Sequence, residues 1–194
     1  MSLSRKAPVL KLKKTAFAFQ QDAVNLIKDK EYFAIFHEQG LGKTKIAIDL
    51  IFDWLEFNKV DSVVIVCDKI LLNNWVDELD FHGNLPPILL TNNKEDNFYK
   101  FNTPGFIYIC NYELIRSSLD SFEAFFKSRK IGIILDESTK IKNPKTKISK
   151  ALHHLAKFTK KRLIMTGTPV ANRPYDYWSQ IYFLDFGERL GTNY

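Results

Sequence analysis

Cysteine is scarce in this chain of 194 residues, which contains only Cys67 and Cys110. Each ends an apolar run, so we expect two buried thiols rather than a disulfide framework. No apolar run approaches the roughly 18 residues that a membrane span needs, and the basic N-terminus lacks the apolar segment of a secretory signal. These absences favour a cytoplasmic location, or a nuclear one if the source is eukaryotic.

Repeats, low-complexity tracts and internal linkers are also lacking. A chain of this length with 45% hydrophobic residues is expected to form one globular domain with a sizeable core. The net charge of +6 fits an anionic partner but does not identify one. The arrangement of motifs along the chain must therefore carry the functional interpretation.

Six short apolar runs do not alternate with polar residues, which is typical of strands buried on both faces of a parallel sheet. They span 32–36, 62–67, 87–90, 106–110, 131–136 and 162–166, and helical patterns occupy about 20–29, 44–57, 69–81, 111–127, 146–157 and 174–184. This order predicts an α/β fold, a mostly parallel sheet flanked by helices on both faces. We interpret the polar stretch 91–105 as a surface excursion and the basic residues 1–14 as an N-terminal arm.

The most specific local pattern is His37–Thr44, HEQGLGKT, placed between a predicted strand and a predicted helix. Gly40 and Gly42 allow backbone N–H groups to close around phosphate oxygens, and the helix N-terminus adds partial positive charge. Lys43 is expected to reach the β- and γ-phosphates, and the Thr44 hydroxyl to bind Mg²⁺. Because His37 stands where the strict pattern has glycine, an ordinary glycine turn before a helix remains the alternative.

An acidic pair, Asp136-Glu137, follows the most apolar predicted strand. Ligands gather at the C-terminal edge of a parallel sheet, so we expect Asp136 to bind Mg²⁺ and Glu137 to act as the general base toward water. The alternative is a helix N-cap with acid in its first turn.

Taken together, these motifs resemble those of superfamily 2 helicases, and specifically of Swi/Snf-type DNA translocases, over residues 15–187. Phe19-Gln20 resembles the adenine-sensing glutamine motif, HEQGLGKT the usual DEMGLGKT, and the segment with Asn74-Trp75 the usual LxxNWxxE. Further along, IYICNYEL resembles the TTYE segment, DESTKIKN resembles DEGHRIKN, MTGTPVAN resembles LTGTPIQN, and WSQIYFLDFG resembles LWSLLNFLDPG. Several independent motifs in the same order make the resemblance specific.

The resemblance implies a RecA-like phosphate-loop lobe that uses ATP and Mg²⁺ and lies beside duplex DNA. It implies nucleotide contacts from Phe19, Gln20, Gln39, Gly40, Leu41, Gly42, Lys43, Thr44 and Lys45. Asn111 and Tyr112 would lie on the DNA track, and Thr166, Gly167 and Thr168 would couple the nucleotide to the DNA. A second lobe would supply arginine fingers, and residues 188–194 would begin the connection to it. Thr139 replaces a histidine that often couples the acidic motif to the third motif, so the resemblance does not imply the strength of ATP–DNA coupling, although it still implies nucleotide binding.

Acidic residues are absent between Ser138 and Tyr175, where the chain carries ten basic residues. These are Lys140, Lys142, Lys145, Lys147, Lys150, Lys157, Lys160, Lys161, Arg162 and Arg173. Lysine contacts to phosphate give binding that is independent of base sequence and sensitive to salt, and we expect them from Lys140, Lys142, Lys145, Lys147 and Lys150. A solvated face is the alternative, and no base-reading signature is present.

Three functions therefore stay open. The first is an enzyme, the ATP-binding lobe of a DNA-stimulated ATPase that moves on duplex DNA and is weak or inactive by itself. The second is a non-catalytic module that binds ATP or DNA and needs a partner for turnover. The third is a phosphate-loop kinase, which leaves TGTP and the basic run unexplained. Trp75 and Trp178 are interpreted as packing residues rather than as platforms for stacking bases.

Overall fold

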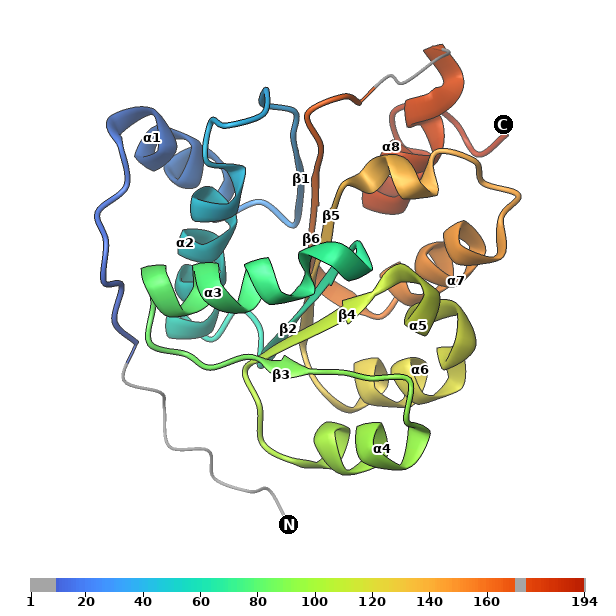
Figure 1. Ribbon diagram of the computed structural model, residues 1–194. Coiled ribbons are helices and arrows are strands. Elements are labelled where there is room, and N and C mark those ends of the chain that lie inside the picture. The colour runs from blue at the N-terminus through green and yellow to red at the C-terminus, as the bar shows by residue number, and fades with distance from the viewer. Residues whose placement is uncertain (1–9, 170–173, 194) are drawn as a thin grey trace.

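The computed structural model describes residues 10–169 and 174–193. Its centre is a six-stranded sheet in the order β1-β6-β5-β2-β4-β3, in which every pair of neighbouring strands is parallel (Figure 1). The strands are β1 (Tyr32–Ile35), β2 (Ser62–Cys67), β3 (Ile88–Leu89), β4 (Ile107–Asn111), β5 (Ile131–Asp136) and β6 (Thr159–Met165). The predicted fold class is confirmed.

One face of the sheet is covered by α1 (Ala18–Ile27), α2 (Lys43–Glu56) and α3 (Leu72–His82), the last preceded by the short 3₁₀ helix η1 (Lys69–Leu71). Successive strand residues point to opposite faces, so the even spacing of Val63, Ile65 and Cys67 places all three against these helices. Helix α2 is buried along most of its length, and Trp54 within it is 1% exposed. This helix therefore anchors the loop that precedes it to the core.

The opposite face is covered by the second half of the chain. Its helices are α4 (Lys94–Asn102), α5 (Tyr112–Ser117), α6 (Leu119–Ser128), α7 (Lys147–Ala156) and α8 (Trp178–Asp185), with the 3₁₀ segments η2 (Ser138–Ile141) and η3 (Pro174–Tyr177) (Figure 1). Val64 and Val66 of β2 pack on this side, together with a cluster of phenylalanines from α4 and α6. Both thiols, Cys67 and Cys110, are free and buried, as expected.

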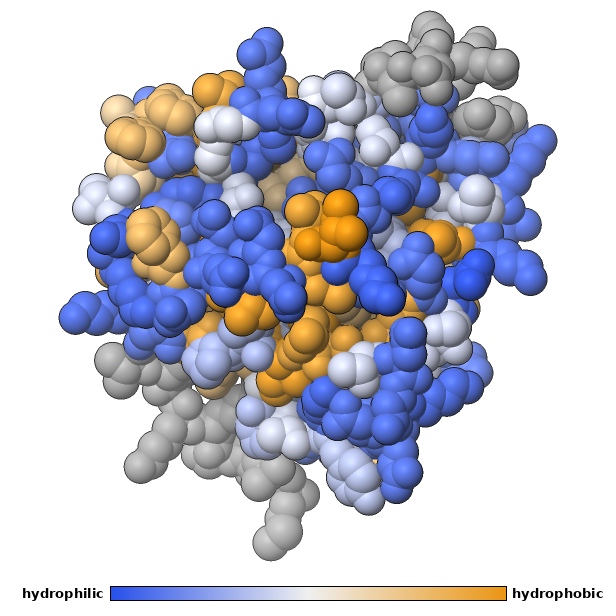
Figure 2. Space-filling view, in the orientation of Figure 1, coloured by the Kyte–Doolittle hydropathy of each residue, from blue (hydrophilic) through white to orange (hydrophobic). Residues whose placement is uncertain are grey.

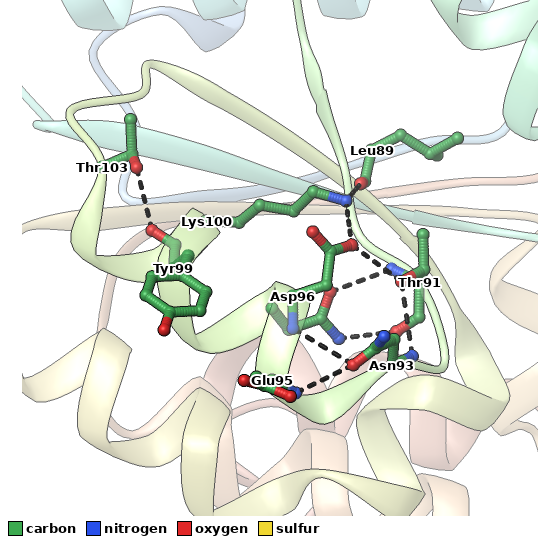
Figure 3. Close-up of polar contacts among 9 residues, drawn as sticks. Leu89, Thr91, Asn93, Glu95, Asp96, Tyr99, Lys100 and Thr103 are labelled. Carbon is green, nitrogen blue, oxygen red and sulfur yellow. Dashed lines mark hydrogen bonds and ion pairs between the residues drawn. The ribbon is translucent and has the colours of Figure 1, made fainter.

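The prediction for 91–105 is wrong in part, because this polar stretch contains helix α4. Asn93 caps it by accepting hydrogen bonds from the backbone N–H groups of Glu95 and Asp96 (Figure 3). The Lys100 ammonium lies 2.6 Å from an Asp96 carboxylate oxygen and also donates to the Leu89 carbonyl (Figure 3). Capping and an i,i+4 ion pair thus form a helix whose apolar periodicity is weak.

Other boundaries also differ from the prediction, and two of them have a clear cause. The single helix expected over 111–127 is two helices, separated at Ser118, whose φ of −130° and ψ of 31° lie outside the helical region. Strand β6 begins three residues before the apolar run, at Thr159, because its polar first residues pair with β5 across a register shift near Ile131. Backbone pairing, which side-chain hydropathy does not report, set this boundary.

Residues 10–14 lie along the end of α3, where Lys13 N–H donates to the His82 carbonyl and Lys13 Nζ lies 3.0 Å from Asp80 Oδ1. The rest of the expected arm, 1–9, lies outside the described residues. Within the described part of the chain, no helix has the length and apolar character needed to cross a membrane.

Candidate functional site

Three of the sequence motifs meet at the C-terminal edge of the sheet. The phosphate loop follows β1, the acidic pair ends β5, and Thr166-Gly167-Thr168 follows β6, which lies between the other two strands (Figure 1). Residues that are far apart in the sequence are thus brought to adjacent strand ends, where a parallel α/β sheet binds its ligands.

The phosphate loop depends on its glycines for two different reasons. Gly40 and Gly42 have φ values of 81° and 67°, in the left-handed region that L side chains rarely adopt. At Gly42 space is limiting as well, since a Cβ would lie 2.2 Å from Gln20 Nε2. Gln20 is 4% exposed, and its Oε1 accepts from the backbone N–H of Phe17. Helix α1 is therefore placed against the loop through Gln20.

Lys43 begins helix α2 and lies across the loop. Its Nζ donates to the carbonyls of His37 and Glu38 at 2.9 and 3.0 Å. A Cβ placed on Gly167 would be 3.7 Å from this Nζ and 3.1 Å from the Gln39 side chain, so the loop after β6 approaches the phosphate loop closely. No acidic residue occupies the first turn of α2, which leaves the positive end of the helix dipole available to an anion.

A cavity of about 470 Å³ opens beside this loop. It is lined by Thr15, Phe17, Phe19, Gln20, Gly40, Leu41, Gly42, Lys43, Thr44, Lys45, Glu78 and His82. The Phe17 and Phe19 rings are stacked, 6.1 Å between centroids and 7° between planes, and remain 73% and 47% exposed. The lining of this cavity thus combines flat exposed aromatic faces, which suit a base, with the backbone of the glycine loop, which suits a phosphate chain.

Two residues that line the cavity, Lys45 and Phe17, differ from what the sequence predicts. Lys45 was expected to contact the nucleotide, but its ammonium group is paired with Asp49 at 2.5 Å and both side chains are buried. The arrangement does not support a nucleotide contact from that ammonium group. Phe17 was not singled out, although its position two residues before Phe19 is an aromatic pairing that the sequence displays.

Two aromatic residues from other elements hold Asp136, one through its carboxylate and one through its backbone carbonyl. Trp75 Nε1 donates to Asp136 Oδ2 at 2.9 Å, and the Tyr112 hydroxyl donates to the Asp136 carbonyl at 2.6 Å. Burial raises the pKa of the Asp136 carboxyl, and the negative charge of Glu137 raises it further. The hydrogen bond from Trp75 and the positive charge of Lys43 lower it, but the net shift is upward. The influence of Lys43 is itself a sign that the two motifs lie close together.

Glu137 adopts an unusual backbone conformation, with φ of 52° and ψ of 55°. A residue that has a Cβ occupies this left-handed region at a cost of order 1–3 kcal/mol, which surrounding contacts must offset. The Thr166 hydroxyl donates to Glu137 Oε2 at 3.2 Å, and Thr166 Oγ1 accepts from the Thr168 N–H at 3.2 Å. The acidic pair and the TGT segment are thus joined by a continuous chain of hydrogen bonds.

The expectation that Tyr112 contacts DNA is wrong for its side chain, which is fully buried. Burial also holds the pKa of Tyr112 well above that of a free phenol, so its hydroxyl remains a donor to Asp136. Asn111 caps α5 by accepting from Leu114 N–H, and it lines a shallow hollow with Lys69, Ile70 and Lys140. Figure 2 shows hydrophobic residues exposed near the start of α3, where Ile70 is 87% exposed.

The basic run is divided between opposite edges of the sheet and does not form one surface. Lys140, Lys142 and Lys145 precede α7 near the acidic pair, and Lys147 and Lys150 lie in the first turns of α7. The remaining described members lie at the other edge, where Lys161 and Arg162 are only 8% and 3% exposed. Arg162 donates to the Leu184 carbonyl and pairs with Glu31, so it is a core residue.

The basic run therefore does not form one positive surface, whereas the five lysines expected to contact phosphate, from Lys140 to Lys150, all precede or begin α7. Arg173 lies outside the described residues. Two of the lysines near the acidic pair have acidic neighbours: Lys140 Nζ is 2.9 Å from Asp68, and Lys142 Nζ is 3.9 Å from Asp176. Lys145 is exposed.

The residues at this edge fit a nucleoside triphosphate with Mg²⁺. The positive φ values of Gly40 and Gly42, and the absence of a Cβ at Gly42 and Gly167, leave the backbone room to approach phosphate. The described residues contain no group of three or more His, Cys, Asp and Glu side chains able to hold a metal ion by themselves. A site of one hydroxyl, one carboxylate and the oxygens of the nucleotide and water is the kind that Mg²⁺ takes.

Fold and site together define a parallel α/β domain of the phosphate-loop type. Comparison with known proteins places it further: the SNF2-related domain family matches residues 20–189, and the chain belongs to this family. The family resemblance inferred from the motifs is confirmed.

Individual relatives agree with this assignment. The chain is 30% identical over 197 residues to the human TATA-binding protein-associated factor 172, and 32% identical over 162 residues to a probable chromatin-remodeling complex ATPase chain of Oryza sativa subsp. japonica. These matches cover 90% and 76% of this chain, but only 10% and 14% of the relatives. The SWI2/SNF2 ATPase core of Sulfolobus solfataricus, solved with dsDNA, has the same fold with a TM-score of 0.77 at 24% identity, covering 91% of this chain and 37% of that one.

Proposed function

We propose that this chain is the ATP-binding lobe of a DNA-stimulated ATPase that translocates on duplex DNA. The observation that carries the proposal is the convergence at one sheet edge of the phosphate loop, the acidic pair and the TGT segment, with the Lys140–Lys145 loop beside them. A phosphate-loop kinase would have no use for that loop. Several relatives are DNA repair proteins or chromatin-remodeling ATPases, which favours the same function.

In this proposal ATP lies in the cavity beside the phosphate loop. Phe17 and Phe19 hold the base, and Gln20 fixes the loop against α1. The Lys43 ammonium exchanges its carbonyl partners for phosphate oxygens, which are stronger charge-assisted acceptors. Thr44 and Asp136 would hold Mg²⁺, which would supply positive charge beside the phosphates. Glu137 accepts a proton from water, and Thr166 fixes the direction of its carboxylate.

The DNA face is proposed to consist of the Lys140–Lys145 loop together with Lys147 and Lys150. Two lysines in the first turns of a helix oppose its dipole, at a typical cost of 0.3–1 kcal/mol each at an exposed position. Helix α7 has no acid in its first turn to offset them, and its Thr146 cap is an uncharged hydroxyl. The fold therefore gains little stability from these two charges, whereas the phosphate backbone of a DNA duplex would attract them.

Replacing Lys140, Lys142 and Lys145 together with alanine should flatten the salt dependence of DNA binding. If three or four phosphate contacts form, log K should fall against log salt with a slope of about −3 to −4, and the triple variant should reduce that slope by up to about three. The measurement is the affinity for a duplex of arbitrary sequence at several salt concentrations.

A matched control removes three positive charges at the opposite edge, through Lys130, Lys157 and Lys160, all of which are exposed. This variant should keep the original slope, although its net charge changes equally. Equal slopes of log K against log salt in the two triple variants would mean that DNA binds elsewhere and that the Lys140–Lys145 loop is only a solvated surface.

Turnover is proposed to require a second lobe, since the chain spans only a small share of its relatives. An arginine supplied across a cleft raises phosphoryl-transfer rates by about 10³–10⁵ in comparable enzymes. ATP hydrolysis should therefore be weak in the 194-residue chain and stimulated by duplex DNA in a two-lobed form of the protein. A two-lobed form that binds ATP but shows no DNA-stimulated hydrolysis would instead favour a non-catalytic binding module.

A further inference from the structure

The acidic pair, the TGTP segment and the last helix converge on one buried side chain, Gln180, to which the motif analysis gave no role. Gln180 of α8 is fully buried, and its Oε1 accepts from the hydroxyl of Ser138, also fully buried, at 2.6 Å. Its Nε2 donates to the carbonyls of Pro169 and Asp176 at 3.0 and 3.1 Å. The oxygen and both amide hydrogens are thus used, so the side chain has one well-defined orientation.

Each partner of Gln180 is attached to a different part of the proposed machinery. Ser138 directly follows Glu137, whose left-handed conformation is held at this point of the chain. Pro169 directly follows Thr168, whose N–H is bonded to Thr166. Asp176 is the residue whose carboxylate faces Lys142 of the basic loop at 3.9 Å.

We infer that Gln180 is a positioning residue that couples the nucleotide site to the Lys140–Lys145 loop. A displacement of Glu137 or of the TGTP segment must either move Gln180 or break a hydrogen bond in a water-excluded environment. Buried polar networks of this kind resist partial rupture, because each freed group loses its partner and gains no water. The network therefore transmits a shift at one site to Asp176 and, through it, to Lys142.

The hydrogen bond between Ser138 and Gln180 depends on the residues that this chain has at those two positions. The motifs as usually written, DEGHRIKN and LWSLLNFLDPG, have a small residue and a leucine there, and this pair cannot form the hydrogen bond. Ser138 and Gln180 lie 42 residues apart and are hydrogen-bonded only because α8 packs beside η2.

The inference rests on the proposed function, and its test measures the coupling between two ligands separately from each affinity. The probes are a fluorescent 20-base-pair duplex and the non-hydrolysable analogue AMP-PNP with Mg²⁺. The coupling factor is the ratio of the DNA dissociation constants without and with saturating analogue. Allosteric factors are commonly 5–150-fold, and we expect about tenfold for the wild-type chain.

Ser138→Ala removes one hydrogen bond and leaves Gln180 bound to both carbonyls. It should bring the coupling factor to within about twofold of one, while each ligand measured alone binds within about twofold of the wild-type chain. Gln180→Glu, which keeps the acceptor toward Ser138 but loses both donors, should act in the same direction. Ser62→Ala is the matched control. Ser62, the first residue of β2, is equally buried and donates to the Gly105 carbonyl. Loss of its hydroxyl should leave the coupling factor unchanged.

A purely structural role for Gln180 predicts a different pattern. Thermal stability and both affinities would then fall together in Ser138→Ala and Gln180→Glu, and their coupling factor would equal that of the wild type. That result, or a coupling factor of one for the wild-type chain, overturns the inference but does not contradict the proposed function. Failure of the wild-type chain to bind either probe overturns the proposed function, and the inference with it.

Discussion

Lys43→Ala is expected to abolish the thermal stabilisation of this protein by ATP and Mg²⁺. For the wild-type chain, nucleotide at about 100 times its dissociation constant should add about 2.7 kcal/mol to the free energy of unfolding. For a domain of this size that corresponds to a rise in Tm of roughly 5–10 °C. The variant should show no rise at the same concentration, because the loop loses the cation that opposes the phosphate charge.

The geometry indicates why the fold should survive this change. Among the described residues, Lys43 Nζ donates to the carbonyls of His37 and Glu38, both in the loop itself, and Lys43 is partly exposed. Losing such hydrogen bonds typically costs about 1 kcal/mol each, and water can replace the donor here. The Tm without nucleotide should therefore change little.

Lys94→Ala is the matched control, since Lys94 is an exposed lysine that begins helix α4 on the opposite face of the sheet. It should keep the full response to nucleotide. If Lys43→Ala were stabilised by ATP as strongly as the wild type, Lys43 would not belong to the nucleotide site.

Glu137→Gln should separate ATP binding from hydrolysis. The amide has nearly the shape of the carboxylate and can still accept the Thr166 hydroxyl hydrogen, so the left-handed turn at this position should persist. It cannot take a proton from water, and loss of a general base typically lowers rates by about 10²–10⁴. We expect hydrolysis to fall by that factor in a two-lobed form of the protein, with ATP-dependent stabilisation unchanged.

A second carboxylate-to-amide change, Glu95→Gln, provides the comparison. Glu95 is an exposed residue of α4, far along the chain from the motifs, so its loss should leave both binding and rate intact. A Glu137→Gln variant that hydrolysed ATP at the wild-type rate would transfer the role of base to another group.

The sequence was a better guide to the strands and motifs than to the contacts between them. All six apolar runs became strands, because residues buried on both faces must be apolar wherever the strand falls in the sheet. The polar stretch 91–105 misled because α4 is held by an Asn93 cap and an ion pair, and presents mainly Phe101 to the core. Hydropathy alone underestimates a helix of this kind.

The lysines expected to contact DNA were selected from a continuous basic segment, whose described members do not share one surface. Between Lys150 and Lys160 the chain crosses the whole sheet along α7, so neighbours in sequence lie at opposite edges. Arg162 is basic by composition yet buried under Tyr32 and Phe186, where its guanidinium packs against both rings. Tyr112 likewise belongs to a family motif yet faces the interior.

The sequence by itself determined which chemical groups this protein possesses and in which order. The glycines of the phosphate loop, the acidic pair and TGTP are local patterns, fixed by the backbone freedom, charge and hydroxyl groups that phosphate chemistry requires. Only the tertiary structure decided which distant side chains orient them. Trp75 binds Asp136 and Gln180 binds Ser138 because parallel strands and crossing helices bring those residues together. Such contacts depend on packing in three dimensions, and spacing along the chain carries no record of them.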